Sequence, residues 1–271
     1  MGEHTLEELH WAAEFKSPEE VAALIAEVTD VDALDEERTA LWRAVHAGRP
    51  DNVEVLLAAG ADPARQMMYG WSPARLSLAT EHPLPTDEVL TPEERAVIAE
   101  RDRLVAALGG LPRDDGHSLA CVAGVDAETA VRRLEAEPVE VTEQVWTWDA
   151  DQAVVGVTTV PGGCVVMQPK GFAATHVLER LSVGTVGFDM YANPKGGNHG
   201  AICRDGEYEA GDLQTGGGVD AEDTAADVLL AHLYQGEPVA YCLAFAGLRP
   251  TDARAFTAPD LWVRLPGHLT A

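Results

Sequence analysis

The residues whose types and spacing could do chemistry gather between Lys170 and Cys203 of this 271-residue chain. Imidazole and carboxylate groups exchange protons near neutral pH, and a lysine beside glycine-rich backbone can hold an anion. The candidates for a small-molecule ligand site are Lys170, His176, Asp189, Lys195 and His199.

The segment 193–200, which reads NPKGGNHG, is the most unusual part of this stretch. Backbone N–H groups of a glycine-rich turn can cradle a phosphate. The segment lacks the G-x-x-x-x-G-K-[ST] pattern, however, and Lys195 precedes the glycines instead of following them. A hairpin loop is therefore the favoured interpretation, with phosphate binding as the alternative.

Metal and thiol chemistry find less support. His199 and Cys203 are four residues apart, but a zinc site usually needs a second close pair of ligands, and none is present. A Cys-His dyad of His176 with Cys164 or Cys203 is possible chemistry, yet nothing local marks these thiols as activated. The sequence predicts no metal and no cofactor, leaves the catalytic residues unknown, and favours a chain that is not an enzyme.

A second group of candidates lies in the N-terminal third. The short stretch 67–71 holds two methionines, a tyrosine and a tryptophan in what reads as an exposed turn. Aromatic residues and methionine are over-represented among the anchors of protein interfaces. The predicted partner-binding residues are Trp42, Met67, Met68, Tyr69 and Trp71. The alternative is that a second domain folds back and covers them.

Repeated elements must position this second group. Residues 39–63 read TALWRAVHAGRPDNVEVLLAAGADP, and related runs begin 32 residues earlier and 33 residues later. Each half of the copy holds an apolar stripe at helical spacing. A pair of short helices cannot bury its apolar face alone, so such pairs must stack on one another.

This pattern resembles the ankyrin repeat. Thr39 and Ser72 are residue types that cap helix N-termini, and Gly48 and Gly60 allow the positive φ at which a helix often ends. The resemblance implies an ankyrin helical solenoid of about three repeats over residues 5–111, whose concave surface binds another protein.

The third copy departs from the pattern. Pro83 and Pro85 forbid an immediate second helix. The sequence Thr-Pro-Glu-Glu at 91–94 is then typical of a helix start, and the helix is predicted to end near Leu108. We interpret this copy as a terminal cap with an inserted loop, followed by a linker at 111–116.

From about residue 116 the pattern changes to short runs rich in β-branched and aromatic residues. Strands are predicted at 118–122, 144–148, 153–160, 164–168, 184–191, 201–204, 208–212 and 239–246. Helices are predicted at 126–134, 175–181 and 223–234. The expected fold is thus an ankyrin domain, 1–112, followed by an α+β domain with a mainly antiparallel sheet, 116–271.

Part of the second domain resembles a family of domains of unknown function that is widespread in actinobacteria. The similarity lies in GVDAE at 124–128, GCVVMQPKGFA at 163–173 and LERLSVG at 178–184. An acidic residue and an asparagine that are usual in the family near Gln168 and Lys170 are missing here. The resemblance covers residues 116–212 and implies no activity.

Charge narrows the choice of partner. The chain has 45 Asp and Glu against 19 Lys and Arg, which gives a net charge of −26. Proteins that bind nucleic acids or anionic membranes present basic surfaces, so both are excluded as partners. The sequence also shows no signal-peptide pattern and no apolar run of about 18 residues.

Two functions follow from these features. The first is a cytoplasmic protein-protein interaction protein whose ankyrin repeats bind a basic partner, in its specific form as an inhibitor or immunity-type protein. The charge could also serve solubility alone. The second is an enzyme or small-molecule binder with its site in the C-terminal domain and the repeats as a docking arm. The identity of the partner and the oligomeric state stay open.

Overall fold

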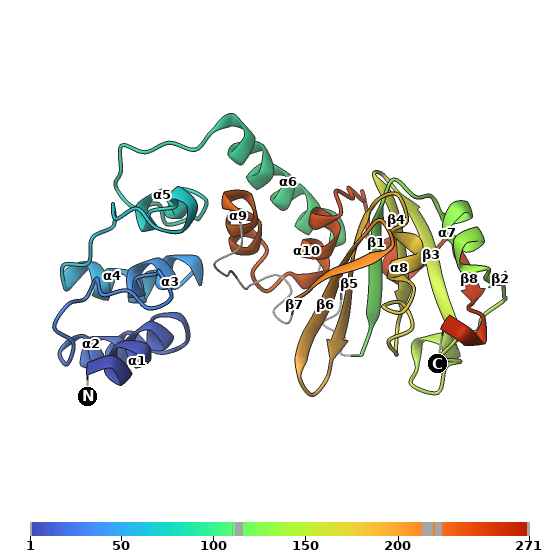
Figure 1. Cartoon of the computed structure of the whole chain (residues 1–271), viewed down its shortest axis with the longest axis horizontal. Helices are drawn as coiled ribbons and strands as arrows, with labels where there is room; N and C mark the ends of the chain where they lie inside the picture. Colours follow the sequence, from blue (N-terminus) through green and yellow to red (C-terminus); the bar gives the residue numbers. More distant parts are fainter. Residues whose placement is uncertain (1, 110, 112–115, 213–218, 220–223, 270–271) are drawn as a thin grey trace. The chain divides into compact units, whose positions relative to one another are not determined.

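The computed structural model describes residues 2–109, 111, 116–212, 219 and 224–269 (Figure 1). The chain divides into two compact units, one of residues 1–98 with 219–235 and the other of residues 99–218 with 236–271. Among the described residues, no helix is both long enough and apolar enough to span a membrane.

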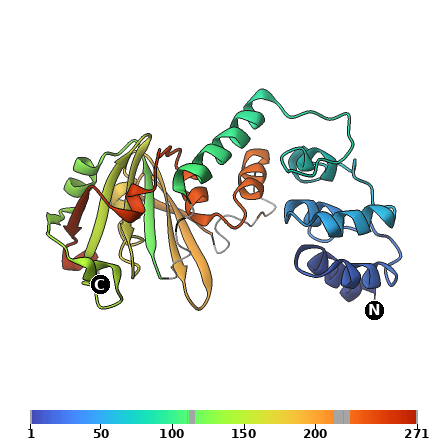
Figure 2. The same ribbon diagram turned by 180° about the vertical axis from the view of Figure 1, so that it is seen from behind.

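The first unit is built from stacked pairs of short helices, seen as successive layers in Figure 1 and Figure 2. Helix α1 packs against α2 and α3, α2 packs against α4, and α3 packs against α4 and α5. This arrangement confirms the predicted helical ankyrin fold. The elements are α1 (Gly2–Phe15), α2 (Pro18–Ile25), α3 (Ala40–His46), α4 (Pro50–Ala58), the 3-10 turn η1 (Met68–Gly70) and α5 (Pro73–Ser77).

Local sequence explains where these helices begin. The hydroxyl oxygens of Ser17, Thr39 and Ser72 each accept a hydrogen bond from the backbone N–H three residues later. Each of these bonds satisfies a donor that the first helical turn leaves without a partner. Gly48 and Gly60 leave their helices at φ +62° and +93°, where a side chain would be strained. The predicted caps are thereby confirmed.

The third repeat has an inner helix but no outer one. Pro83 stands 33 residues after Pro50, which begins the outer helix of the second repeat. Residue 84 precedes Pro85 and is thereby disfavoured from helical geometry. The chain is irregular from residue 81 to 91 and becomes helical again only in α6 (Pro92–Leu108).

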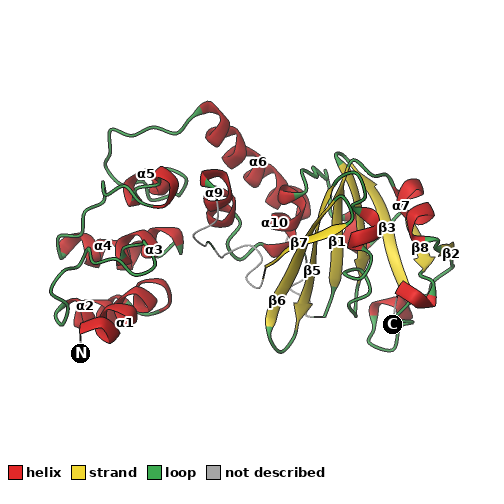
Figure 3. Cartoon of the chain, in the orientation of Figure 1, coloured by secondary structure: helices red, strands yellow, loops and turns green. Residues whose placement is uncertain are grey.

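The second unit is an antiparallel sheet with the strand order β2-β8-β3-β4-β1-β5-β6-β7 (Figure 3). Every pairing between neighbouring strands is antiparallel, which confirms the predicted sheet type. The strands are β1 (Ser118–Ala123), β2 (Glu137–Pro138), β3 (Val154–Val160), β4 (Gly163–Gln168), β5 (Val186–Asn193), β6 (Gly197–Arg204), β7 (Glu207–Asp212) and β8 (Leu261–Arg264).

Helices cover both faces of this sheet. On one face, Ala120 and Val122 of β1 join a buried core with residues of α7 and α8. On the other face, Phe188 of β5 packs edge-on against Tyr241 and Phe245 of α10. The helical elements of this unit are α7 (Ala127–Leu134), η2 (Glu143–Trp146), α8 (Leu178–Leu181), α10 (Pro238–Phe245), α11 (Arg254–Thr257) and η3 (Gly267–Leu269).

Two predicted strands are wrong. The apolar run 239–246 forms α10, because periodicity alone cannot separate a buried strand from a buried helix, and Pro238 occupies the first turn. The run 144–148 forms η2, whose start is capped by the Thr142 hydroxyl. The helix predicted at 175–181 is also shorter than expected, since only α8 is helical there.

One helix lies apart from its neighbours in sequence. The run predicted as a helix at 223–234 forms α9 (Ala225–Leu233), which belongs to the first compact unit although more than 100 residues separate it from α5. The domain boundary expected from the sequence, between residues 112 and 116, would assign this helix to the second domain. The docking of α9 depends on tertiary contacts that its own sequence does not reveal.

Candidate functional site

The predicted partner-binding tryptophans lie beneath α9. Trp42 and Trp71 are 1 % and 0 % exposed. The Trp71 indole N–H donates a hydrogen bond of 2.9 Å to the carbonyl oxygen of Ala225, in the first turn of α9. The Trp42 indole N–H donates in turn to the Trp71 carbonyl oxygen at 3.1 Å. Each ring thus buries its apolar body and satisfies its polar atom.

Histidines hold the other end of α9. His232 Nδ1 donates to the carbonyl oxygen of His46 at 3.0 Å, and the Gln235 amide donates to His46 Nδ1 at 2.8 Å. The His46 ring stacks on Trp42 at 4.8 Å between centroids and meets the His232 ring at 5.5 Å. Hydrogen bonds therefore fix the start of α9 to Trp71, just before α5, and the end of α9 and the residues after it to His46 of α3.

The remaining residues of this group differ in exposure. Met67 is buried, and the Thr39 hydroxyl donates to its sulfur at 3.7 Å. Tyr69 is 46 % exposed and has φ 54°, the left-handed region that a non-glycine residue seldom adopts. The side chain of Met68 lies outside the described residues. Of the four described side chains, only Tyr69 presents a large surface to an external partner, and the partner-binding role of the set stays a prediction.

Burial keeps two histidines of the first unit, His46 and His10, in the neutral form. The pKa of His46 lies well below 6.5, mainly because burial penalises the charged ring and then because His232 is close. Burial also lowers the pKa of His10 to about 4, with Arg43 adding to the effect. Protonation of either ring would place a charge inside the repeats.

Acid is therefore expected to weaken the first unit. These rings bind a proton in the unfolded chain near pH 6.5 and in the folded chain only at lower pH, so the free energy of unfolding falls as pH drops below 6.5. His10 alone contributes about 3 kcal/mol to this fall by pH 4. Hydrogen exchange of the α3 amides between pH 7.5 and 4.5, corrected for intrinsic rates, measures it.

Two variants separate this effect from general acid sensitivity. His46→Gln should flatten the pH dependence of α3 protection, whereas His4→Gln, at an exposed site, should leave it unchanged. Equal slopes in the wild type and His46→Gln would contradict the assignment.

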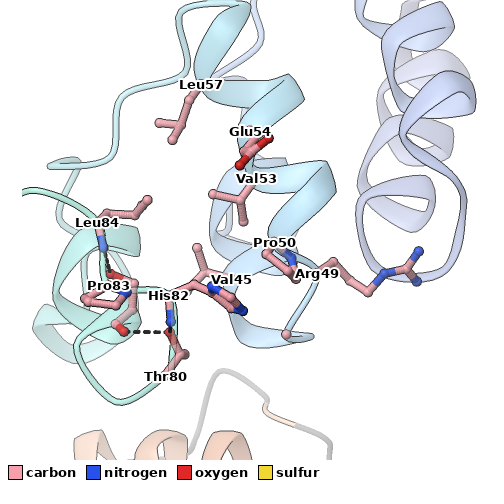
Figure 4. A pocket seen from close by; sticks show the side chains of 12 residues that line it. Val45, Arg49, Pro50, Val53, Glu54, Leu57, Thr80, His82, Pro83 and Leu84 are labelled. Carbon is pink, nitrogen blue, oxygen red and sulfur yellow. Dashed lines mark hydrogen bonds between the residues drawn. The ribbon is translucent and has the colours of Figure 1, made fainter.

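An open groove lies on the repeats at the place of the missing outer helix (Figure 4). It encloses about 300 Å³ and is lined by Val45 of α3, Val53 and Leu57 of α4, Ser77 of α5, and Pro83 and Leu84 of the irregular segment. This groove was not predicted from the sequence. The signal that could have found it is the pair Pro83 and Pro85, at the position where the repeat spacing requires an outer helix.

The electrostatics of the repeats are one-sided. Residues 1–98 hold 20 acidic and 7 basic side chains. All seven basic side chains are held by acceptors within the unit, on carboxylates for Lys16, Arg38, Arg43 and Arg75 and on carbonyl oxygens for Arg49, Arg65 and Arg95. Exposed carboxylates that form neither an ion pair nor a side-chain hydrogen bond with another described residue are Glu27, Glu37, Asp51, Glu54, Glu81, Asp87 and Glu93. The unit thus presents uncompensated negative charge.

In the second unit, two of the predicted ligand residues share a face of the sheet. Asp189 pairs with Ala201 across β5 and β6, and Tyr191 pairs with His199. Paired residues point to the same side of a sheet, as do residues two apart on one strand, so Asp189 and His199 lie on one face. The glycine-rich segment forms the tight end of this hairpin, as the favoured interpretation expected.

The other three predicted residues are distributed around this hairpin. His176 is exposed, and its ring meets that of Phe172 at 5.2 Å, which in turn meets Tyr191 at 6.2 Å. Lys170 lies over the Trp148 ring at 5.5 Å, and Lys195 is exposed in the turn. The ligand-binding role of these five residues stays a prediction.

Asp189 is the unusual group in this unit. It is 5 % exposed, and burial raises the pKa of its carboxyl to about 8, although a hydrogen bond from the Ala201 backbone acts in the opposite direction. Asp189 is therefore mainly protonated at neutral pH.

Among the described residues, no three His, Cys, Asp or Glu side chains are grouped so that they could hold a metal ion.

The thiols are also held in their neutral form. All four cysteines are buried and unlinked. Burial raises the pKa of Cys164 to about 12 and that of Cys203 to about 11. A thiolate nucleophile is disfavoured at both positions, which weakens the Cys-His dyad considered from the sequence.

Comparison with known proteins supports the first unit. Residues 6–67 match the family model of ankyrin repeats (3 copies). No curated protein matches the chain. Ankyrin repeats are protein-binding modules, and the helix pairs described above have the stacked arrangement that such a module requires. The N-terminal part of this chain is thus an ankyrin-repeat region.

Proposed function

We propose that this chain binds a basic protein through its ankyrin unit and acts on that protein as an inhibitor or immunity-type partner. The observation that carries the proposal is the charge asymmetry of residues 1–98. Its cations are bound by acceptors within the unit, while seven exposed carboxylates form neither an ion pair nor a side-chain hydrogen bond with another described residue.

Such a surface has a physical consequence for association. Charges that no internal partner compensates project a field into solvent, which steers an oppositely charged protein to the surface and repels acidic ones. Counter-ions screen this field over about 10 Å at 0.1 M salt and about 3 Å at 1 M. Binding that depends on it must weaken as salt is raised.

The test compares the full chain with a variant in which the seven carboxylates, Glu27, Glu37, Asp51, Glu54, Glu81, Asp87 and Glu93, become amides. Both are immobilised and exposed to a lysate of the source organism, and retained proteins are identified by mass spectrometry. We expect basic proteins that elute between 0.1 and 1 M NaCl and that the variant retains weakly. Retention of acidic proteins, or retention insensitive to salt, would contradict the proposal.

The inhibitory role needs a separate measurement. Once a partner is purified, its own activity should fall as the chain is added and reach its minimum near one equivalent. A partner that binds with the expected salt dependence yet keeps full activity in the saturated complex would leave the binding function and remove the inhibitory one.

A further inference from the structure

The groove on the repeats lies where the outer helix of the third repeat would be expected. In the first two repeats the outer helices α2 and α4 pack side by side. The repeat spacing would place a third outer helix at residues 83–91, but this segment is irregular and leaves part of α4 uncovered. Val53 and Leu57 of α4 line the resulting space, with Pro83 and Leu84 opposite (Figure 4).

The lining of the groove combines aliphatic and proline side chains with a few polar residues, among them Glu54, Thr80 and His82. The Ser77 hydroxyl donates to the Ala74 carbonyl oxygen at 2.6 Å and accepts from the Leu84 backbone N–H at 2.8 Å, so it is satisfied within the unit. The Arg49 side chain, though its residue borders the groove, donates to the carbonyl oxygens of Glu14 and Lys16. Ser77 and Arg49 are thus engaged within the unit, and the aliphatic lining residues, such as Val53, Leu57 and Leu84, offer apolar contact.

The rim of the groove is acidic. Glu54 lines the groove, and Asp51 and Glu81 each adjoin a lining residue in sequence. All three are exposed and form no ion pair with another described residue. An occupant that buries apolar side chains here would bring its flanks beside these carboxylates, which favours lysine or arginine at the flanks.

We propose that this groove receives a basic amphipathic helix of the partner protein, which takes the place of the missing outer helix of the third repeat. The inference rests on the proposed function and specifies its contact surface. The groove lies where the repeat geometry would place an outer helix, so a helix fits its position. Its apolar walls favour apolar side chains on one face of that helix, and its acidic rim favours cations beside them. The tryptophans beneath α9 are not needed for this contact, because α9 already covers them.

The experiment uses the full chain and two synthetic helical peptides of about 15 residues. Both peptides carry leucine at positions i, i+3, i+4 and i+7; one has lysine at the remaining positions and the other glutamate. Binding is followed by fluorescence anisotropy of the labelled peptide. We expect the lysine peptide to bind and the glutamate peptide not to bind.

Point variants locate the binding. Glu54→Lys should weaken the lysine peptide about fivefold, because it replaces an attraction at the rim by a repulsion. Leu57→Glu should weaken it about tenfold by placing a charge in the apolar wall. Glu27→Lys is the matched control: it changes net charge equally at an exposed site that does not line the groove, and should stay within about twofold.

The outcomes separate this inference from the function on which it rests. If Glu54→Lys weakens binding no more than Glu27→Lys, or if the lysine peptide does not bind the wild type, the groove is not the seat. The proposed function would still stand if the variant with seven amides lost its basic partner. Because Glu54 is exposed, Glu54→Lys gives a result even if Leu57→Glu fails to fold.

Discussion

Asp189→Asn is expected to stabilise the second unit by an amount that grows by on the order of 4 kcal/mol between pH 5 and pH 8. The wild-type carboxyl has a pKa of about 8 in the folded chain, because it is buried on β5, and an ordinary pKa of 3.8 otherwise. The unfolded chain therefore releases this proton first. Stability is fully present below the ordinary pKa and is lost as pH rises towards 8. An asparagine of the same size carries no such penalty.

Hydrogen exchange of the β5 and β6 amides, corrected for intrinsic rates, measures this difference across the pH range. Asp149→Asn is the matched control, because Asp149 is exposed and the same change of charge there should leave the pH profile unaltered. Parallel profiles for the wild type and Asp189→Asn would show that the buried carboxyl does not govern the pH dependence. The slope is opposite to that expected of the first unit, where buried histidines weaken the fold in acid.

Trp71→Ala is expected to cost the first unit about 4 kcal/mol and to release α9. The indole is fully buried, packs beneath the cation of Arg75 at 4.2 Å, and donates to the Ala225 carbonyl oxygen. Its loss removes apolar contact and leaves a cavity, and α9 loses the hydrogen bond at its first turn. Hydrogen exchange should show the amides of Ala225–Leu233 losing protection before those of α3.

Two further substitutions separate the contribution of the hydrogen bond from that of apolar contact and control for the residue type. Trp71→Phe keeps most of the apolar contact and loses the hydrogen bond, so we expect a smaller cost, about 1 kcal/mol from the lost bond. Trp11→Ala is the control for the residue type, since Trp11 is 53 % exposed, and its cost should stay below that of either change at Trp71. If Trp71→Ala exposed α3 and α5 to exchange but left α9 protected, the role assigned to Trp71 would be wrong.

The burial of Trp42 and Trp71 changes where a partner can bind. From the sequence, these rings were expected either at an open surface, because aromatic residues in a predicted turn are typical of interface anchors, or beneath a second domain that folds back over them. In the structure, α9, which begins 154 residues after Trp71 in the sequence, covers both rings. Whatever partner the repeats bind must displace α9 or use another surface, and the groove beside α4 is such a surface.

Much of the architecture could be predicted because it depends on neighbours in sequence. Thr39 and Ser72 cap the helices that follow them, and the 33-residue spacing sets the stacked pairs. Pro161 and the two glycines after it mark the hairpin between β3 and β4. Local hydrogen bonds and backbone preferences determine these features, so a short stretch of sequence is enough to show them.

Where prediction failed, the deciding contacts were between distant residues. The apolar run 239–246 is compatible with a strand or a helix. In the structure it is helical, and two of its aromatic rings pack against Phe188 of the sheet. The strand β8, four residues long, became visible only through its pairing with β3. Short apolar segments take the structure that their tertiary neighbours favour.

The sequence by itself determined the ankyrin pairs, the antiparallel sheet and the negative charge. Helix caps and turns depend on residues that are close in sequence, and the net charge depends on composition alone. Only the tertiary structure decided that α9 covers the tryptophans, that a groove stays open beside Val53 and Leu57, and that Asp189 is buried in its neutral form. Exposure, cavities and pKa values depend on which distant atoms exclude water from a group, and the local pattern of residues carries no record of that.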